Sequence, residues 1–226
     1  MPAPVAVFDL DGTLVDTAPD LLATLDVVLV AAGYEPLPEE KAFGTIGHGS
    51  KVMIEHALDL QNVEPTEAIV KPMHEHFLAY YAENISVGSR PFEGVADALD
   101  RLAAEGAVLA VCTNKYEDLS VKLLDALGLS RRFAAIVGAD TLGVRKPDPA
   151  HLLGTIERAG GDRARAVMVG DSRTDIDAAK AAQVPVIAVD FGYTDTPVRQ
   201  LGPDHVISHY TALYELAAPL LGLSRV

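Results

Sequence analysis

Short apolar runs recur along the chain, and most of them are followed at once by polar or charged side chains. Five runs have the length of buried strands and a weaker sixth comes after them: Val5–Phe8, Val108–Cys112, Ala134–Val137, Ala166–Val169, Val184–Val189 and His205–Ser208. Between the later runs, apolar residues recur every three or four positions, which is the spacing of an amphipathic helix. This alternation predicts an α/β fold in which helices cover a sheet of parallel strands.

The interval between the first two runs is different, because it is long and mostly helical in pattern. Helical spacing extends over residues 21–29, 50–60 and 66–84, and Pro72 is expected to kink or split the last segment. Gly88–Pro91 is typical of a linker that leads back to the sheet. We therefore predict a helical cap at residues 18–87, inserted into a core made of residues 1–17 and 88–226.

Composition and charge exclude several classes of protein. The chain has 226 residues and a formal net charge of −14, which argues against a nucleic-acid or anionic-membrane partner. The single cysteine, Cys112, excludes an internal disulfide and fits a reducing compartment. The N-terminus lacks a basic region and no apolar stretch has membrane-spanning length. These features predict a soluble cytoplasmic protein, and they leave a monomer and a homodimer equally open.

The residues directly after the strand runs are the candidates for chemistry, since ligands bind at the carboxyl ends of strands in open parallel sheets. Four groups follow four successive runs, and Lys146 comes several residues after its run: Asp9, Asp11, Gly12 and Thr13; Thr113, Asn114 and Lys115; Lys146; and Asp171 with Asp175. Because these strand ends share one edge of the predicted sheet, we expect the four groups to meet there.

The residue types in these groups suit phosphoryl transfer. Carboxylates such as Asp9, Asp11 and Asp171 are the hard oxygen ligands that Mg²⁺ prefers. Asp175 lies one helical turn beyond Asp171, so that both can face one ion. Lys146 supplies a positive charge where negative charge spreads in the transition state. The four groups therefore predict a magnesium-dependent site for a small phosphorylated metabolite.

The remaining polar groups are suited to holding the phosphoryl oxygens. Gly12 and Thr13 lie where the first strand turns, and we expect their backbone N–H groups to be free for an anion. Thr113 and Asn114 add a hydroxyl and an amide to orient the phosphoryl group.

These motifs together resemble those of a known superfamily. The pattern D-L-D-G-T-L-V-D at residues 9–16, T-N at 113–114, K-P at 146–147 and G-D-S-R-T-D at 170–175 is similar to the four motifs of the haloacid dehalogenase superfamily of phosphatases. A helical insertion after the first motif resembles the cap of this superfamily. The resemblance implies a Rossmann-like parallel core with strand order 3-2-1-4-5.

The resemblance also implies catalytic roles. Asp9 would be the nucleophile that forms an aspartyl-phosphate, and Asp11 would protonate the leaving oxygen and then activate water. Thr113 and Asn114 would bind the phosphoryl group, while Lys146 would bridge it and the nucleophile. Mg²⁺ would be held by Asp9, the backbone carbonyl of Asp11, and Asp171, with support from Asp175.

Within the superfamily, three segments are similar to the phosphoglycolate phosphatase branch. They are T-N-K at 113–115, G-T-I-G-H-G at 44–49 and F-G-Y-T-D at 191–195. This similarity implies 2-phosphoglycolate as the substrate, although pyrophosphatase and sugar-phosphate members share parts of the pattern. The glycine-rich loop is expected to close over the substrate and to bring Gly47, His48 and Gly49 near it, with Lys51 beside them and Lys115 contributing from the core.

Two other functions use similar residues. A phosphomutase would move the phosphoryl group to another hydroxyl, and product analysis separates it from a hydrolase. A signalling receiver domain also combines aspartates, threonine, lysine and Mg²⁺, but its phosphorylated aspartate follows the third strand. The position of Asp9 after the first strand and the long helical insertion count against a receiver domain.

Overall fold

A parallel six-stranded sheet forms the centre of the protein. The computed structural model describes residues 2–38, 41, 43–194 and 196–223. The sheet order is β5-β4-β1-β6-β7-β8. The strands are β1 (Ala3–Phe8), β4 (Val108–Cys112), β5 (Ala135–Val137), β6 (Gly161–Gly170), β7 (Val186–Val189) and β8 (His205–Ile207). The predicted order 3-2-1-4-5 is confirmed, and the weak sixth run adds an edge strand beyond it.

The first strand lies in the middle of the sheet and is buried on both faces. Val7 of β1 pairs with Ala110 of β4 on one side and with Met168 of β6 on the other. The residues of Val5–Phe8 have no exposed surface. The apolar run that opens the chain is therefore explained by a strand with sheet neighbours on both sides and helices above and below.

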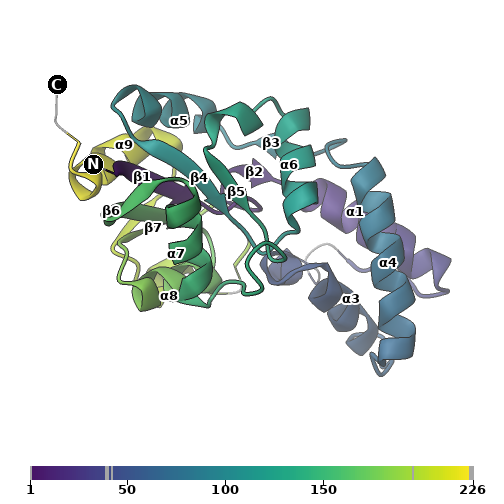
Figure 1. Ribbon diagram of the computed structural model, residues 1–226. Coiled ribbons are helices and arrows are strands. Elements are labelled where there is room, and N and C mark those ends of the chain that lie inside the picture. The colour runs from purple at the N-terminus through teal and green to yellow at the C-terminus, as the bar shows by residue number, and fades with distance from the viewer. Residues whose placement is uncertain (1, 39–40, 42, 195, 224–226) are drawn as a thin grey trace.

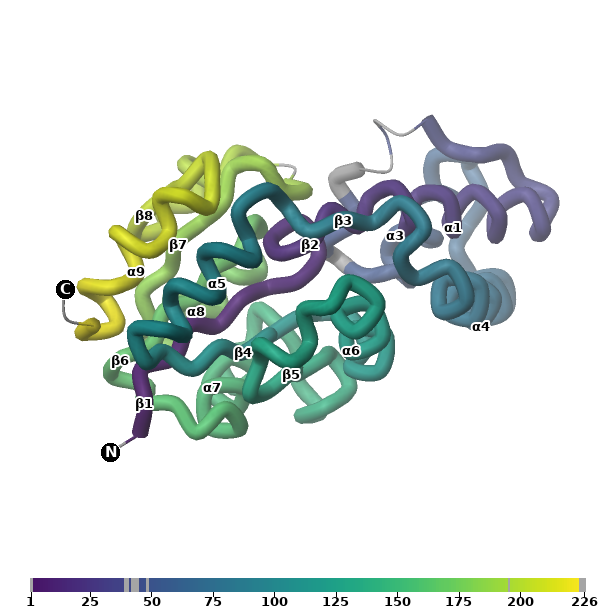
Figure 2. The backbone as a smooth tube through the Cα atoms, turned by 90° about the horizontal axis from the view of Figure 1, so that it is seen from above, coloured from purple at the N-terminus to yellow at the C-terminus, as the bar shows by residue number. Residues whose placement is uncertain are grey.

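Helices cover both faces of the sheet, as Figures 1 and 2 show. They are α5 (Val95–Ala104), α6 (Glu117–Ala126), α7 (Pro149–Arg158), α8 (Arg173–Ala182) and α9 (Leu213–Leu221). Val5 and Val7 belong to a cluster with Leu152 of α7 and Ile176 of α8, whereas Phe8 belongs to the cluster of the opposite face. The period of two along β1 thus divides its side chains between two apolar layers.

The long interval after β1 forms a helical unit beside the sheet (Figure 1). It contains α1 (Ala18–Ala31), the 3₁₀ segment η1 (Phe43–His48), α3 (Ser50–Asp59) and α4 (Glu67–Glu83). Pro72 lies inside α4, which continues as one helix, so the split is contradicted and the alternative, a kink, stays a prediction. The proline stands in the second turn, where the helix loses one hydrogen bond and keeps its packing against α1 and α3.

A short antiparallel ribbon connects this helical unit to the sheet. Its strands are β2 (Val15–Asp16) and β3 (Arg90–Pro91), which pair through Val15 with Pro91 and through Asp16 with Arg90. The segment that leaves the sheet for the helical unit and the segment that returns from it therefore lie side by side. The predicted cap boundaries at residues 18 and 87 stay a prediction, and the ribbon pairs just outside them.

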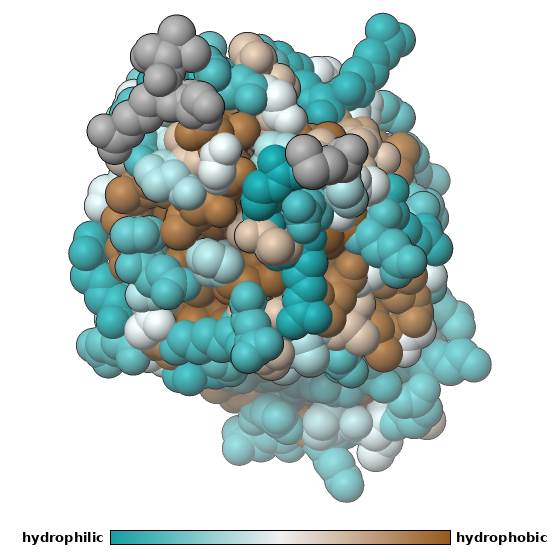
Figure 3. All heavy atoms as spheres, turned by 60° about the vertical axis from the view of Figure 1, so that its left-hand side comes forward, coloured by the Kyte–Doolittle hydropathy of each residue, from teal (hydrophilic) through white to brown (hydrophobic). Residues whose placement is uncertain are grey.

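The surface mixes polar and apolar residues. In the face shown in Figure 3, hydrophilic side chains cover much of the molecule and apolar residues show between them. The large hydrophobic side chains that the described residues leave exposed are Val30, Leu60, Val87 and Tyr116. In the described part of the chain, no helix combines the length and the apolar character needed to cross a membrane.

Candidate active site

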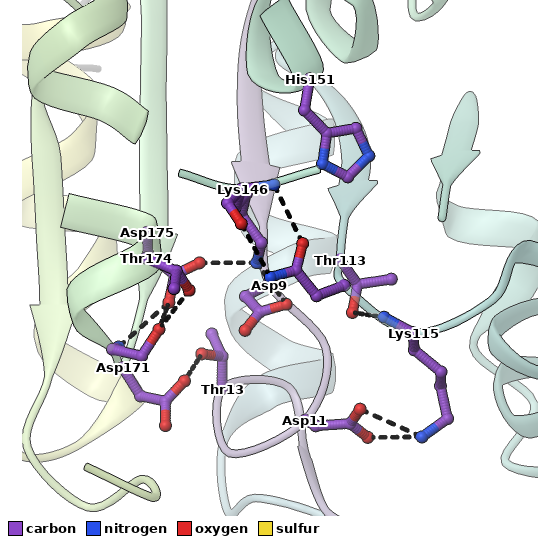
Figure 4. Close-up of polar contacts among 12 residues, drawn as sticks. Asp9, Asp11, Thr13, Thr113, Lys115, Lys146, His151, Asp171, Thr174 and Asp175 are labelled. Atoms are coloured by element: carbon purple, nitrogen blue, oxygen red, sulfur yellow. Dashed lines mark hydrogen bonds and ion pairs between the residues drawn. The ribbon is translucent and has the colours of Figure 1, made fainter. Parts of the chain in front are cut away.

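Three buried carboxylates meet at the carboxyl ends of β1 and β6. Asp9, Asp171 and Asp175 are 7%, 1% and 0% exposed, and each offers an oxygen within 4.8 Å of the others. The Lys146 ammonium lies between two of them, 2.7 Å from Asp9 Oδ1 and 2.6 Å from Asp175 Oδ1 (Figure 4). Three carboxylates facing one ammonium carry a formal excess of two negative charges when all are ionised, which is the charge of one divalent cation.

The electrostatics of this cluster are unfavourable without a further cation. Burial, together with the neighbouring Asp175, raises the pKa of Asp9 to about 7 against the attraction of Lys146. Burial, followed by the charges of Asp175 and Asp9, also raises the pKa of Asp171 well above its usual range. For Lys146, burial opposes the charge but the two carboxylates raise its pKa overall. The cluster therefore favours binding of a positive charge.

One oxygen of the cluster is poorly satisfied by the protein. Asp9 Oδ1 is buried and, although it is close to Lys146, the direction of that contact gives it no hydrogen bond. A buried carboxylate oxygen in this condition is costly unless something else binds it. Together with the hard oxygen donors around it, this atom fits a metal such as Mg²⁺.

Asp175 is held more tightly than the other two carboxylates. Its Oδ2 accepts hydrogen bonds from the backbone N–H of Ser172 at 3.0 Å and from the Ser172 hydroxyl at 2.6 Å. These contacts belong to a capping box at the start of α8. With its other oxygen on Lys146, Asp175 fixes the position of the lysine as well as contributing negative charge.

Asp171 is oriented by the turn that follows β1 and by the loop that follows β7. Thr13 Oγ1 donates to its Oδ1 at 3.0 Å, and the backbone N–H of Tyr193 donates to its Oδ2 at 2.6 Å. Gly12 passes close by with a φ of +80°, and a Cβ atom there would lie 2.5 Å from Asp171 Oδ2. Glycine is therefore required at position 12 both for the turn and for the approach of Asp171.

The expectation that the N–H groups of Gly12 and Thr13 are free for an anion is wrong. The N–H of Gly12 donates to the Val15 carbonyl at 2.9 Å, and the N–H of Thr13 donates to the Leu10 carbonyl at 3.4 Å. The chain reverses so sharply after β1 that these donors close the turn on its own carbonyl groups. Of the two residues, the Thr13 hydroxyl is the group that reaches the carboxylate cluster.

The residues after β4 support the lysine loop. The Asn114 side chain accepts from the backbone N–H of Lys146 and donates to its carbonyl oxygen, both at 3.0 Å. Thr113 is 2% exposed, and its hydroxyl accepts from the N–H of Lys115 at 3.2 Å. Asn114 thus positions Lys146, a role that the sequence did not indicate, and its contact with a phosphoryl group stays a prediction.

Asp11 lies apart from the carboxylate cluster. Its two oxygens each accept a hydrogen bond from the Lys115 ammonium at 3.0 Å (Figure 4). The same ammonium lies 4.5 Å from the ring centroid of Tyr81, which comes from α4. Lys115 therefore holds the Asp11 side chain toward the helical unit, away from the carboxylate cluster. The expected contact of the Asp11 backbone carbonyl with a metal stays a prediction.

A cavity of about 480 Å³ lies between the helical unit and the carboxyl end of the sheet. Asp9, Asp11, Thr113, Asn114 and Lys115 line it from the core. From the helical unit it is lined by residues that include Leu21, Gly47, Gly49, Lys51, Met53, His74, Phe77 and Tyr81. Gly47, Gly49 and Lys51 thus reach the cavity as expected, whereas the side chain of His48 lies outside the part of the structure described.

The geometry agrees with comparisons to known proteins. A family model for haloacid dehalogenase-like hydrolases matches residues 6–189. The chain belongs to this family. It is 53% identical to a phosphoglycolate phosphatase of Mesorhizobium japonicum over 98% of each chain. It is 50% identical to that of Agrobacterium fabrum, over 93% of this chain and 91% of the relative.

A solved structure gives the same fold. The crystal structure of a predicted phosphoglycolate phosphatase from Haemophilus somnus 129pt aligns with a TM-score of 0.89 and 31% sequence identity, over 96% of this chain and 98% of that one. The predicted haloacid dehalogenase resemblance is therefore confirmed, and the chain is a hydrolase of this family.

Two tyrosines at this haloacid dehalogenase site were missed from the sequence. Tyr81 has the helical spacing of an apolar residue, four positions after Phe77, and nothing in the pattern marks its hydroxyl. Tyr193 lies in the F-G-Y-T-D segment, whose last residue, Asp195, is outside the described residues. The Tyr193 hydroxyl donates to Asp16 Oδ1 and accepts from the N–H of Ala18 at 3.0 Å. The resemblance to the phosphoglycolate phosphatase branch identified this segment but not its contact with Asp16 and Ala18.

Proposed function

We propose that the protein is a magnesium-dependent phosphatase that hydrolyses 2-phosphoglycolate through an aspartyl-phosphate on Asp9. The observation that carries the proposal is the position of Asp9, which joins the buried carboxylates and Lys146 on one side and faces the cavity on the other. The names of the two relatives at 50% identity or more support the substrate. In this proposal the cap of residues 18–87 closes over a core of residues 1–17 and 88–226.

The metal site follows from the donor set. Asp9 and Asp171 would hold Mg²⁺ directly together with the Asp11 backbone carbonyl, and Asp175 would support them from the helix start. When bound, Mg²⁺ supplies the positive charge that lets a phosphate dianion approach the Asp9 carboxylate. The Lys146 ammonium, 2.7 Å from Asp9 Oδ1, also contributes positive charge.

The first chemical step is attack by Asp9 on phosphorus. A carboxylate oxygen forms a bond to phosphorus while the bond between phosphorus and the ester oxygen breaks. Asp11 gives a proton to the departing oxygen, so that an alcohol leaves. Its place on the cavity side of the nucleophile suits this role, since the alcohol must depart into the cavity.

In the second step, water releases the phosphate. Asp11, now a carboxylate, takes a proton from a water molecule, and the resulting hydroxide attacks phosphorus and frees Asp9. The net reaction consumes one water and yields glycolate and inorganic phosphate. Thr113 and Asn114 are proposed to hold the phosphoryl oxygens in both steps, with Lys146 stabilising their charge.

Phosphate release tests this proposal directly. We would assay 2-phosphoglycolate beside pyrophosphate, sugar phosphates and an aryl phosphate, each with Mg²⁺ and after chelation. The proposal predicts release that depends on Mg²⁺ and a specificity constant that is highest for 2-phosphoglycolate. A higher value for pyrophosphate or a sugar phosphate would reject the substrate, and full activity after chelation would reject the metal.

The covalent step is tested by replacing the nucleophile. Asp9→Asn should fold normally and lose turnover by about 10⁴-fold or more, the range found when a nucleophile is removed from other enzymes. Thr66→Ser, at the exposed start of α4, is a matched conservative control and should leave turnover unchanged. Folded Asp9→Asn protein with near wild-type turnover would contradict the aspartyl-phosphate.

A further inference from the structure

Lys115 is a buried cation beside the place where the leaving group must lie. Its side chain is 6% exposed and lines the cavity. The other cationic side chains of the described cavity lining are at the rim: Lys51 is 48% exposed and pairs with Glu55 and Glu67, and Arg145 is exposed. His74 is kept neutral, because burial and then Lys51 lower its pKa. The interior of the cavity thus presents one ammonium group.

Tyr81 provides a second polar group at the same point. The residue is 1% exposed, and its hydroxyl oxygen is buried without a hydrogen-bond partner among the described residues. The Lys115 ammonium lies over the Tyr81 ring, 4.5 Å from its centroid. A buried hydroxyl without a partner, on the wall of a cavity, is suited to bind an oxygen of a ligand.

The helical unit also contributes apolar side chains to the cavity wall. Leu21, Met53 and Phe77 line the cavity from the helical unit. One buried ammonium and one buried hydroxyl beside such side chains match a small leaving group with a single negative charge. A second phosphate would bring two negative charges to one buried ammonium in a chain of net charge −14.

We propose that Lys115 and Tyr81 form the subsite that binds the carboxylate of the leaving group and thereby select the substrate; this rests on the proposed hydrolysis of 2-phosphoglycolate. An ammonium has three N–H donors. Two of them serve the oxygens of Asp11, and the third is available for a substrate oxygen. The Tyr81 hydroxyl donates to the same carboxylate from the cap.

The position of Asp11 limits the length of the substrate. Asp11 is the proposed acid for the ester oxygen, and Lys115 is one hydrogen bond away from it, at 3.0 Å. A carboxylate bound by Lys115 must therefore be attached very near the ester oxygen. In 2-phosphoglycolate a single methylene group separates the two, whereas a longer chain would have to fold back on itself.

The test compares two esters that differ only at this group. We would measure kcat/KM for 2-phosphoglycolate and for 2-hydroxyethyl phosphate, in which a hydroxymethyl group replaces the carboxylate, and use their ratio. Lys115→Met keeps the length of the side chain and removes its charge, so the ratio should fall about 10- to 100-fold, the effect of one hydrogen bond to a charged group. Tyr81→Phe should lower it about 3- to 10-fold.

Two variants serve as controls. Lys115→Arg retains the charge and should retain most of the ratio, and Lys122→Met, which is exposed on α6, should leave it unchanged. Lys115→Met will also slow both esters because Lys115 holds Asp11, and for that reason the ratio decides and not the rate. Inhibition of aryl phosphate hydrolysis by glycolate gives a second readout, and its inhibition constant should rise in Lys115→Met.

The outcomes separate this proposal from the proposed function. If wild-type protein prefers 2-phosphoglycolate and both Lys115→Met and Tyr81→Phe keep the wild-type ratio, the subsite is overturned while the function stands. If wild-type protein does not prefer 2-phosphoglycolate, the proposed substrate falls. In that event an unchanged glycolate inhibition constant in Lys115→Met would overturn the subsite as well, and a raised constant would support it.

Discussion

The imidazole of His151 lies fully buried beside the active-site lysine. Its Nε2 is 3.0 Å from the Gly138 carbonyl oxygen and donates to it, while Nδ1 has no partner among the described residues. Burial, and then the charge of Lys146, lowers the pKa of His151 to about 4. The ring is therefore neutral in the folded protein at a pH where an unfolded chain would protonate it.

This difference predicts a pH dependence of stability. Between about pH 4 and 6.5 the His151 position binds one more proton in the unfolded state than in the folded state, so the contribution of His151 to the free energy of unfolding falls as the pH is lowered through this window. The loss amounts to about 3 kcal/mol at the acid end. Denaturant unfolding of wild type and His151→Gln between pH 4 and 7 measures it, since the glutamine amide can still donate to Gly138. If the free energy of unfolding varied with pH in the same way in the two proteins, the lowered pKa of His151 would be contradicted.

Individual residues also show what the sequence can and cannot indicate. The carboxylates and Lys146 were predicted because such residues occur together at four successive strand ends, although each one alone has an ordinary structural explanation. The free N–H groups at Gly12 and Thr13 were predicted wrongly, because a turn that is tight enough to use its own donors has the same sequence as one that leaves them open. Tyr81 was missed because a buried phenol on a helix follows the pattern of a phenylalanine.

At the scale of elements, the ribbon of β2 and β3 is secured by Asp20 in the first turn of α1. Its carboxylate accepts from the N–H groups of Gly88 and Ser89 at 2.7 and 2.8 Å and from the Ser89 hydroxyl at 2.6 Å. Asp20 is 6% exposed and Ser89 is fully buried. One side chain therefore joins the two chain segments by which the cap is attached.

Replacing Asp20 should weaken this attachment. Asp20→Ala removes three hydrogen bonds to a charged acceptor and leaves the buried N–H of Ser89 and the partly buried N–H of Gly88 without this acceptor, and we expect it to lower the free energy of unfolding by about 3 kcal/mol. Asp26→Ala is the matched control on the same helix, because it loses one longer hydrogen bond, from the N–H of Leu37 at 3.3 Å. Equal losses for the two variants, measured by denaturant unfolding, would show that Asp20 has no special role in the attachment.

The two glycines of the cap loop are expected to respond differently to alanine. Gly49 has a φ of +97° at the start of α3, which L side chains rarely adopt. Gly47 does not require such a conformation, and a Cβ there would be 3.9 Å from the Cβ of Ser172 and from the Tyr193 carbonyl oxygen. Gly49→Ala should therefore distort the loop at a cost of about 1–3 kcal/mol, whereas Gly47→Ala should fit.

This difference should appear in catalysis. We expect Gly49→Ala to lower kcat/KM for 2-phosphoglycolate about tenfold and more than for an aryl phosphate, whose better leaving group depends less on Asp11. Gly47→Ala is the control for added bulk in the same loop. An unchanged ratio of the two specificity constants in Gly49→Ala would remove the loop from the site. The His48→Ala variant tests in the same assay whether this side chain contributes.

Helices and strands could be predicted from the sequence where their apolar residues recur with a regular spacing. The apolar runs of β1, β4, β6 and β7 indicated strands, and β1 was correctly expected to lie centrally. The first half of β6, residues 161–165, carries polar and partly exposed side chains and gave no signal, although Ala3 pairs with Gly161. The segment that forms β3 was predicted only as a linker, because a strand of two residues has no periodicity to detect.

For the whole molecule, the buried carboxylates predict that metal binding and folding are linked. A cation that binds the folded state and not the unfolded chain raises stability by mass action. Mg²⁺ should raise the melting temperature by several degrees, and Asp171→Asn should abolish this increase. Asp177→Asn, on the exposed side of α8, should keep it. A Mg²⁺ effect of the same size in Asp171→Asn would place the ion elsewhere.

Ca²⁺ distinguishes binding from catalysis at the same site. Its larger and less regular coordination shell should still be accepted by the carboxylates, and so should stabilise the fold. It should fail to align the nucleophile and should therefore inhibit turnover in competition with Mg²⁺. Phosphate release at fixed Mg²⁺ and rising Ca²⁺ measures this, and turnover supported by Ca²⁺ alone would contradict it.

Tyr193 connects the metal cluster to the base of the cap. Its backbone N–H binds Asp171, and its hydroxyl binds Asp16 and the N–H of Ala18, where α1 begins. A single buried residue thus contacts both the Asp171 carboxylate and the segment that leads into the helical unit. If the ion and the closed cap favour the same placement of this tyrosine, their free energies are coupled and the coupling is reciprocal. A molecule that holds the cap shut would then tighten the affinity for Mg²⁺ by the same factor by which Mg²⁺ tightens the affinity for that molecule.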